Sequence, residues 1–338
     1  MPAVTNLPHG LDLSTFDAAR ARLHGRIVDT ALVHLQSGVV AEGGGIDDRG
    51  VTTTPALDDR LPHDVWLKLE CLQVTGSFKA RGALNRVLTL PRERAKRGIV
   101  TASGGNHGLA VAYAGRAIGA PTTVYLPEPT PPAKAARIAR WGADVIRAGA
   151  VWDDAHARAL EHAEREGLTY IHPFADPEVV AGQGTIALEL FDKAPEIDAL
   201  VIAIGGGGLM AGVGAAARLL RPGIRIIGVE PVGAPTLHES LRAGRVIELP
   251  SISTKAGTLA PRRSDPYTFE IIRAVADEIV LVTDDEMKDA ARYLLANVGV
   301  GVELSGAAAV AALLTRKATV AGAKRPCALV CGTGTDAC

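Results

Sequence analysis

The segment Thr75–Gly82 (TGSFKARG) places a lysine in a setting that favours amine chemistry. Lys79 follows a turn and begins a predicted helix, so its amine lies near the positive end of the helix dipole. Such a setting favours the neutral, nucleophilic amine, which can form a Schiff base with a carbonyl compound. A solvated surface lysine is the alternative interpretation, and this segment alone does not decide between the two.

The segment Ser103–Gly108 (SGGNHG) follows the apolar run Ile99–Ala102 and opens a predicted helix. Its backbone N–H groups and the Asn106 amide lie at the carboxyl end of a strand, which is where ligands bind in open α/β sheets. A carboxylate would bind well at this position. The alternative is an ordinary turn in which glycine supplies positive φ and His107 is only a polar residue at the helix start.

Four consecutive glycines, Gly205–Gly208, precede Leu209 between another predicted strand and helix. Successive N–H groups of such a loop, together with the helix N-terminus, can surround a phosphate. The spacing matches neither the dinucleotide-binding fingerprint nor a P-loop, because no Gly-Lys-Ser/Thr follows. The loop therefore favours a small phosphorylated cofactor over a nucleotide.

Cys331 follows the last predicted strand, in the sequence CGTG. A zinc site with Cys327 is excluded, because no further Cys/His cluster completes the ligand set. A thiol at a strand end can be a weak hydrogen-bond partner, although most free cysteines are small core residues.

The elements that must position these segments are short apolar runs alternating with helical stretches, which predicts an α/β fold with mostly parallel sheets. A chain of 338 residues suits one large α/β domain or two lobes. The expected strands are 65–69, 99–102, 122–126, 144–147, 200–204, 225–229, 279–282 and 328–331, and the expected helices are 79–88, 107–117, 132–141, 153–166, 179–191, 209–220, 284–296 and 305–314.

The composition excludes several classes of protein. Lysine plus arginine number 36 and aspartate plus glutamate 37, so no basic surface for nucleic acid or membrane is expected. Four scattered cysteines form no disulfide framework and no secretory signal is apparent, which predicts a cytoplasmic protein. The uncharged run Ala199–Ala217 is long enough for a membrane span, but its six glycines favour strand, turn and helix.

Taken together, these segments resemble the fold-type-II pyridoxal-phosphate enzymes, the tryptophan-synthase-β-like family, and most closely their serine/threonine dehydratase branch. The resemblance implies two lobes, each with a mostly parallel sheet flanked by helices, and a cofactor in the cleft between them. We expect a large domain from 1–97 plus 171–338 and a small domain from 98–170. The matching motifs are Thr75–Gly82, Ser103–Gly108, His172-Pro173-Phe174 with Asp176, Gly182–Thr185 (GQGT), Gly205–Leu209, Gly228–Pro231 (GVEP), Glu303–Ala307 (ELSGA) and Cys331–Gly332.

The resemblance also implies a role for each matching position. Lys79 would carry pyridoxal phosphate and move the α-proton of the substrate, Phe78 would pack beside the cofactor ring, and Asn106 would bind its phenolic oxygen. Cys331 would face the pyridine nitrogen, where a neutral thiol makes the ring a weaker electron sink than a carboxylate would. The phosphate would bind Gly205, Gly206, Gly207, Gly208 and Leu209, and the substrate carboxylate Ser103, Gly104, Gly105, Asn106 and His107.

The implied activity is that of an ammonia-lyase. It would eliminate the β-hydroxyl group of L-threonine, L-serine or a related β-hydroxy amino acid, a small amino-acid substrate, to give a 2-oxo acid and ammonia, and the enzyme would be a homodimer. The nearest alternative is a β- or γ-replacement synthase, in which a second nucleophile traps the intermediate. A non-catalytic cofactor- or amino-acid-binding protein and an unrelated nucleotide-binding protein are further alternatives.

The sequence departs from the family pattern in three places. Racemizing members carry a second serine where this chain has Gly104, so racemase activity is disfavoured. Some relatives bind a divalent cation through Glu-x-x-x-Ala-x-Asp, but here Glu230 and Ala234 are followed by Thr236, so no metal is expected and Glu230 is only a weak candidate ligand. Residues 36–54 are Gly-rich and aperiodic, which indicates a loop. The resemblance implies that this loop is an insertion, which is either a flap near the substrate or a tolerated surface insertion.

Overall fold

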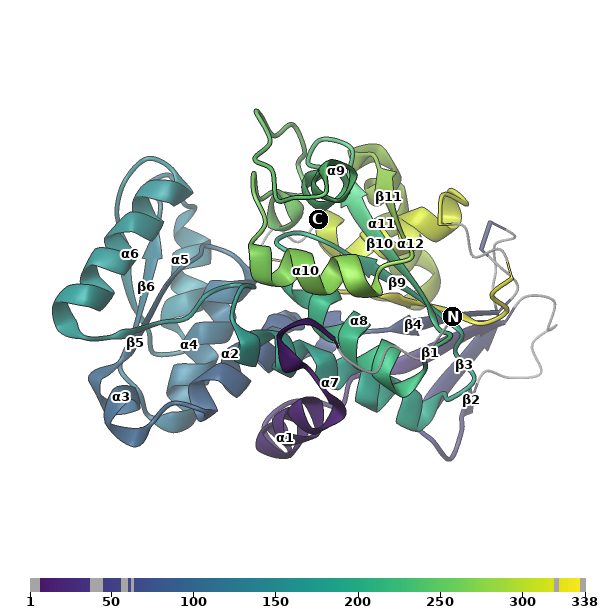
Figure 1. Cartoon of the computed structure of the whole chain (residues 1–338), viewed down its shortest axis with the longest axis horizontal. Coiled ribbons are helices and arrows are strands. Elements are labelled where there is room, and N and C mark those ends of the chain that lie inside the picture. The colour runs from purple at the N-terminus through teal and green to yellow at the C-terminus, as the bar shows by residue number, and fades with distance from the viewer. Residues whose placement is uncertain (1–6, 37–44, 56–59, 62–63, 319–321, 335–338) are drawn as a thin grey trace.

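The structure is a computed structural model that describes residues 7–36, 45–55, 60–61, 64–318 and 322–334. Its strands form one sheet of eight strands and one of four. Figure 1 shows the two sheets in separate lobes lying side by side, each flanked by helices, with the smaller lobe on the left. The predicted α/β class is confirmed.

The larger sheet has the strand order β11-β10-β9-β12-β4-β1-β3-β2. The neighbours from β11 to β4 are parallel, and so are β1 and β3, whereas the pairs β1–β4 and β2–β3 are antiparallel. Its strands are β1 (Leu32–Gln36), β2 (Gly45–Ile46), β3 (Val51–Pro55), β4 (Asp64–Lys68), β9 (Ala199–Ala203), β10 (Arg225–Pro231), β11 (Glu278–Val282) and β12 (Pro326–Leu329).

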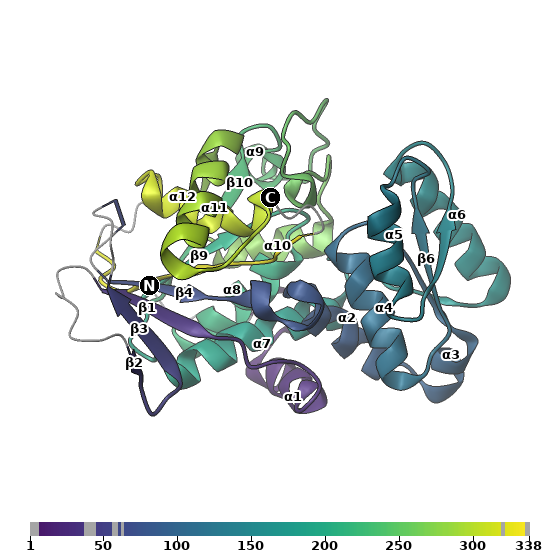
Figure 2. The same ribbon diagram turned by 180° about the vertical axis from the view of Figure 1, so that it is seen from behind.

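Helices cover both faces of the larger sheet, which explains why a central strand such as β9 is apolar throughout and wholly buried. Figures 1 and 2 show α7 and α8 on one side of the sheet and α11 and α12 on the other. The helices of this lobe are α1 (Leu13–Leu23), α2 (Lys79–Leu88), α7 (Pro177–Lys193), α8 (Gly208–Leu220), α9 (Thr236–Ala243), α10 (Pro266–Val275), α11 (Asp284–Val298) and α12 (Leu304–Leu314), with single 3₁₀ turns at Pro8–Gly10, Glu70–Leu72, Val74–Gly76 and Gly257–Leu259.

The smaller sheet is entirely parallel, in the order β7-β6-β5-β8. Its strands all fall between residues 99 and 170, a separation that supports our proposed domain division at 98–170. The elements of this lobe are α3 (Arg92–Arg97), β5 (Ile99–Ala102), α4 (Asn106–Ile118), β6 (Thr122–Leu126), α5 (Pro132–Ala139), β7 (Asp144–Arg147), α6 (Trp152–Glu166) and β8 (Thr169–Tyr170).

Helix α2 joins the two lobes. It packs against α4 of the smaller lobe and against α7 of the larger one. Ala83, Leu84 and Val87 on α2 are buried in one apolar cluster with Ile99 and Val111 of the smaller lobe. The helix that begins with Lys79 is therefore fixed at the junction between the lobes.

The prediction of a loop at 36–54 is wrong for the residues that form strands, and its being an insertion stays a prediction. Gln36 ends β1, and the chain from residue 45 forms β2 and most of β3, which extend the edge of the larger sheet. The polar run VTTTP pairs with β1 in parallel register, so backbone pairing rather than an apolar pattern makes it a strand. Residues 37–44 lie outside the described part of the chain.

The uncharged run Ala199–Ala217 forms strand β9, the glycine loop and helix α8, as predicted. Among the described residues, no helix has the length and apolar character needed to cross a membrane.

Candidate active site

Lys79 is the first residue of α2, as predicted, and its side chain is partly buried. Its Nζ donates a 2.7 Å hydrogen bond to the carbonyl oxygen of Pro173 and lies 5.2 Å from the centre of the Phe78 ring. Burial lowers the pKa of Lys79 to about 8, although the nearby Glu303 carboxylate favours the charged form. The amine is therefore much closer to its neutral, nucleophilic state than a surface lysine is.

The turn His172-Pro173-Phe174 contacts both the Lys79 amine and the glycine loop. Within it, His172 Nδ1 accepts the backbone N–H groups of Phe174, at 3.2 Å, and Ala175, at 2.7 Å. A Cβ atom added to Gly206 or Gly208 would clash with Phe174, so this residue packs directly against the glycine loop.

The glycine loop connects β9 to α8, and hydrogen bonds to one of its carbonyl oxygens hold it in place. Ser264 and Thr268 donate hydrogen bonds of 3.1 and 3.0 Å to the carbonyl oxygen of Gly206. Gly207 has φ +98°, a conformation that glycine adopts without strain. The N–H groups in the first turn of α8, which includes Leu209, have no partner within the helix. They are therefore available to an anion, as the sequence predicts.

Asn106 begins α4 and meets residues from two distant parts of the chain. One hydrogen of its amide binds Glu303 Oε1 at 2.7 Å, and the amide carries a second one. A Cβ on Gly332 would lie 3.1 Å from both Asn106 Nδ2 and Ser77 Cβ, so these side chains meet beside Gly332. Among the described residues, Asn106 Oδ1 and Ser77 Oγ are buried without a hydrogen-bond partner. Buried polar atoms normally have partners, so this corner suits a polar ligand.

The loop before Asn106 lies close to one threonine from each lobe. Ser103 Oγ accepts the N–H of Gly105 at 3.3 Å. A Cβ on Gly104 would approach Thr130 at 3.4 Å, and one on Gly105 would approach Thr258 at 3.7 Å. Both are ordinary contact distances, so the loop is fitted to its surroundings without steric pressure on either glycine.

His107 is buried, and its ring forms a hydrogen bond with the protein backbone. Its Nε2 lies 3.0 Å from the carbonyl oxygen of Ile171, which can only accept, so Nε2 carries the proton. Burial, with Lys79 nearby, lowers the pKa of His107 to about 3, so the ring is neutral. Its Nδ1 then has a lone pair and cannot donate to a carboxylate. The expected role of His107 is therefore limited to its backbone N–H.

Cys331 is buried, and its backbone lies next to Phe78, the residue before Lys79. Its carbonyl oxygen accepts the N–H of Phe78 at 3.2 Å, and its Sγ lies 3.5 Å from the carbonyl oxygen of Leu329. Burial, reinforced by Glu303, raises the pKa of the Cys331 thiol well above its ordinary value, so the thiol stays neutral.

These contacts join the starts of α2, α4 and α8 and the end of β12 into one site. It offers a reactive amine, a loop of free N–H groups and a corner with unpartnered polar atoms. Pyridoxal phosphate presents an aldehyde, a phosphate and a phenolic oxygen, and the residues present fit each of these groups. Sequence reasoning missed Glu303, Thr258, Ser264 and Thr268, although Glu303 lies in the quoted motif ELSGA.

Glu230 is fully buried and serves the protein backbone. Its two carboxyl oxygens accept the N–H groups of Leu237, at 2.9 Å, and His238, at 2.7 Å, in the first turn of α9. Burial raises the pKa of Glu230 to about 8 in spite of these bonds. No group of three or more His, Cys, Asp or Glu side chains suited to a metal gathers in the described ranges. The absence of a metal stays a prediction.

A cavity of about 470 Å³ lies beside the turn that precedes Lys79, outside the site just described. Neither Lys79, Asn106 nor the glycine loop lines it. Its walls are Thr75, Gly76, Leu109, Trp141 and three arginines, Arg116, Arg137 and Arg140.

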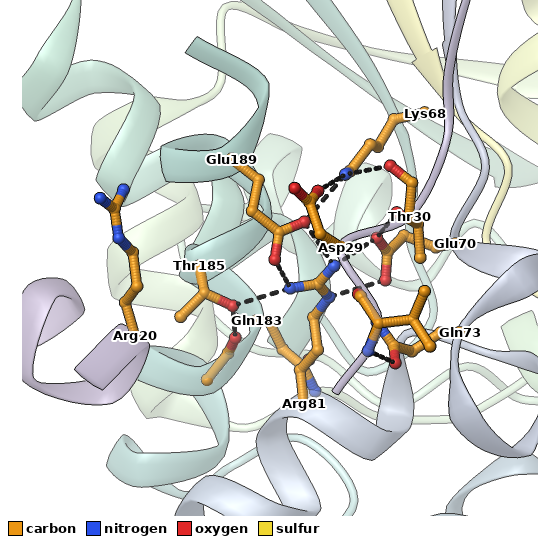
Figure 3. Close-up of polar contacts among 12 residues, drawn as sticks. Arg20, Asp29, Thr30, Lys68, Glu70, Gln73, Arg81, Gln183, Thr185 and Glu189 are labelled. Carbon is orange, nitrogen blue, oxygen red and sulfur yellow. Dashed lines mark hydrogen bonds and ion pairs between the residues drawn. The ribbon is translucent and has the colours of Figure 1, made fainter. Parts of the chain in front are cut away.

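A buried cluster of ions lies two residues beyond Lys79, and no sequence motif indicated it. Figure 3 shows the Arg81 guanidinium between Glu70 and Glu189, and Lys68 Nζ lies 2.8 Å from Glu189 Oε2. All five N–H groups of Arg81 have acceptors, the fifth being provided by Thr185 Oγ1. Burial alone would raise the pKa of Glu189, but Arg81 and Lys68 outweigh it and lower the pKa to about 2. Glu189 is therefore ionised at neutral pH.

Residues 47–332 match the protein family described as pyridoxal-phosphate dependent enzyme. The chain is 42% identical over 271 residues to an L-threonine ammonia-lyase of Geobacter sulfurreducens, an alignment that covers 80% of this chain and 67% of that protein. It is 38% identical over 296 residues to the phenylserine dehydratase of Ralstonia pickettii, covering 85% of this chain and 89% of that protein. The structure of maize serine racemase matches with a TM-score of 0.83 and 31% identity, covering 95% of this chain and 93% of that one.

The fold and the site together fit an α/β enzyme that has a buried lysine and a glycine loop suited to a phosphate group. The chain belongs to the family of pyridoxal-phosphate dependent enzymes, and pyridoxal phosphate is its cofactor, as predicted. The fold is that of the fold-type-II members. The chain spans about two thirds of the length of the Geobacter relative.

Proposed function

We propose that this chain is an ammonia-lyase that removes the β-hydroxyl group of L-threonine, L-serine or a related β-hydroxy amino acid, giving a 2-oxo acid and ammonia. The observation that carries this proposal is the Lys79 amine, which has a pKa of about 8 and lies against the Pro173 carbonyl in a site fitted to pyridoxal phosphate. Relatives named L-threonine ammonia-lyase and phenylserine dehydratase support the same class of reaction.

When it is bound to an amino acid, pyridoxal phosphate draws electrons from the α-carbon, so that the α-proton can leave and the β-substituent can be expelled. We assign the cofactor phosphate to the N–H groups of Gly205–Leu209, its phenolic oxygen to the second amide hydrogen of Asn106, and its ring to Phe78. Cys331 faces the ring nitrogen in this assignment. Because its thiol is neutral, Cys331 itself supplies no negative charge there.

The loop Ser103–His107 holds the substrate carboxylate in this proposal, through backbone N–H groups at the start of α4. Lys79 is the general base at the α-carbon. Its free amine donates one hydrogen to the Pro173 carbonyl, and this bond orients the lone pair that takes the proton. The burial that lowers the pKa of Lys79 also helps the protonated amine to give that proton up again.

Elimination is favoured over racemization because Gly104 has no hydroxyl group to return a proton to the opposite face of the α-carbon. A β- or γ-replacement synthase is the alternative activity. Added sulfide distinguishes the two reactions, because a replacement synthase converts it into a thiol-containing amino acid while a lyase releases the 2-oxo acid and ammonia.

The test is to incubate the holoenzyme with L-threonine, L-serine and L-threo-3-phenylserine separately and to measure 2-oxo acid and ammonia. Equal release of both products from at least one of these substrates, and none from Lys79→Ala, is the expected result. A Lys79→Ala variant with full activity would overturn the proposal, as would wild-type enzyme that incorporates sulfide without releasing ammonia from the β-hydroxy amino acid alone.

The family resemblance further supports a homodimer, and the sequence supports a cytoplasmic location. Light scattering on the purified protein tests the first of these proposals, and fractionation of the source cells tests the second.

A further inference from the structure

The turn His172-Pro173-Phe174 depends on one imidazole nitrogen. His172 Nδ1 accepts the N–H groups of Phe174 and Ala175, so this nitrogen must carry a lone pair, and the proton of the neutral ring sits on Nε2. Pro173 has no N–H of its own with which to close the turn. The histidine therefore supplies the acceptor that two successive backbone donors share.

The two residues that follow His172 contact different parts of the site, one the Lys79 amine and the other the glycine loop. The Pro173 carbonyl accepts a hydrogen bond from Lys79 Nζ at 2.7 Å. Phe174 packs so closely against the glycine loop that neither Gly206 nor Gly208 has room for a Cβ atom. The backbone path of residues 172–175 thus sets the position of a hydrogen-bond acceptor at the amine and of an aromatic ring at the phosphate loop.

We propose that His172 is a positioning residue of this enzyme: by accepting two N–H groups it fixes the turn that aims the Lys79 amine and supports the phosphate loop. This inference rests on the proposed function, and it assigns to His172 no contact with the reacting atoms. The ring packs between Tyr170, at 6.3 Å, and Phe174, at 4.6 Å between centroids. A residue that replaces His172, keeps these ring contacts and cannot accept a hydrogen bond therefore isolates the role of Nδ1.

The acceptor is present throughout the physiological range of pH. Burial lowers the pKa of His172 to about 4, so the ring stays neutral at pH values where enzymes of this kind are assayed. The charged and titratable groups around it are Asp265 and Asp176, which favour the protonated ring, and His156 and Lys79, which oppose it.

Three variants separate the acceptor from the ring. His172→Phe keeps an aromatic ring between Tyr170 and Phe174 but cannot accept a hydrogen bond. His172→Asn loses the ring but places an amide oxygen close to the position of Nδ1. His162→Phe is the matched control, because His162 also engages its Nδ1, with the Tyr125 hydroxyl at 3.2 Å, but on α6 of the smaller lobe.

The measurements are the dissociation constant for pyridoxal phosphate, kcat and KM for L-threonine, and the kinetic isotope effect on kcat with L-threonine deuterated at the α-carbon. For His172→Phe we expect weaker cofactor binding and a lower kcat, each by about tenfold or more, because two donors lose their acceptor. The isotope effect should rise, since a misaligned base makes proton removal slower. His172→Asn should recover both quantities to within about threefold of wild type, and His162→Phe should change neither.

The proposal is overturned if His172→Phe has the cofactor affinity, kcat and isotope effect of the wild type, or if His172→Asn is as impaired as His172→Phe. A wild-type enzyme that is inactive on every β-hydroxy amino acid would contradict the proposed function instead. In that case the order of the cofactor affinities still decides whether His172 acts through its acceptor nitrogen.

Discussion

Arg81 and Glu70 form a two-pronged ion pair in which both side chains are completely buried. Arg81 Nε lies 2.8 Å from Glu70 Oε2, and Nη2 lies 2.8 Å from Oε1. Glu70 belongs to the turn after β4, and Arg81 is two residues beyond Lys79 on α2 (Figure 3). The pair therefore ties the first turn of the helix that carries the reactive lysine to the central part of the larger sheet.

Removing Arg81 should destabilise the whole enzyme rather than only its site. Arg81→Met leaves the carboxylates of Glu70 and Glu189 buried without their main partner, and the loss of one member of a buried ion pair costs about 3–5 kcal/mol. The free energy of unfolding, measured with urea, should fall by that amount. Arg20→Met is the control, because its ion pair with Asp192 is exposed and contributes at most about 1 kcal/mol. Equal effects of the two substitutions would contradict this account.

The glycine loop should not tolerate a side chain at Gly206. In Gly206→Ala the new methyl group meets the Phe174 ring, so the loop must shift away from the position at which its N–H groups can hold a phosphate. We expect pyridoxal phosphate to bind at least about a hundredfold more weakly, because several hydrogen bonds to a charged group are lost. Gly223→Ala serves as the control, since no atom lies within 4 Å of the added group. Titration followed by cofactor absorbance measures both.

Lys79 should react as an amine at unusually low pH. With a pKa of about 8, about a tenth of it is neutral at pH 7, compared with about one in three thousand for an ordinary lysine. The neutral fraction grows as pH rises, so reductive methylation of Lys79 in the cofactor-free chain should accelerate up to about pH 8 and then level off. Peptide mass spectrometry with free Nα-acetyl-lysine in the same sample gives the comparison. A Lys79 profile that follows acetyl-lysine would show that burial does not lower its pKa.

Glu230 should make the protein less stable as pH rises from about 5 to 8. Its pKa is about 8 in the folded chain and near 4.5 when exposed, so the folded state holds a proton that the unfolded chain releases across this range. The stabilisation that this proton provides is present below pH 4.5 and is lost as pH passes 8. Glu230→Gln imitates the protonated form, so its Tm should depend less on pH than that of the wild type. Glu93→Gln, at an exposed position on α3, should leave the wild-type slope unchanged.

A serine at position 104 should fit the site and change the outcome of the reaction. A Cβ there meets Thr130 at 3.4 Å, an ordinary contact, so Gly104→Ser should fold and bind cofactor normally. Its hydroxyl group provides the second proton donor that racemizing relatives carry. Chiral chromatography of L-serine incubated with the variant should therefore detect D-serine above the wild-type level. A variant with normal elimination and no D-serine would show that the hydroxyl alone is insufficient.

The parallel core and the motif residues could be predicted because their signals are local. Strands β5, β6 and β7 and helix α2 have the expected bounds, since each is a short periodic run flanked by glycine or proline. The α1 helix was missed because only Phe16, Ala19 and Leu23 of its eleven residues are buried. Strand β3, one strand in from the edge of the sheet, was missed because its threonines become a strand only through pairing with β1.

The parts of the site that escaped prediction are contacts between residues far apart in the sequence. The Asn106 amide binds Glu303, and the Lys79 amine binds the Pro173 carbonyl. A motif can name each partner, but only the fold brings them within hydrogen-bond distance. His107 shows the same limit in reverse: its place at the start of a helix was predicted correctly, while its hydrogen bond to the Ile171 carbonyl could not be.

Strand β12 comes last in chain order among the described strands, yet it lies between β9 and β4 in the middle of the larger sheet. A chain that ends before residue 326 lacks the strand that joins β9 to β4, so its sheet is left as two halves. Each half then presents an apolar strand with unpaired backbone groups, the kind of edge along which chains join to one another. A product released before this point cannot close the sheet, so premature termination should yield aggregates rather than a smaller folded enzyme.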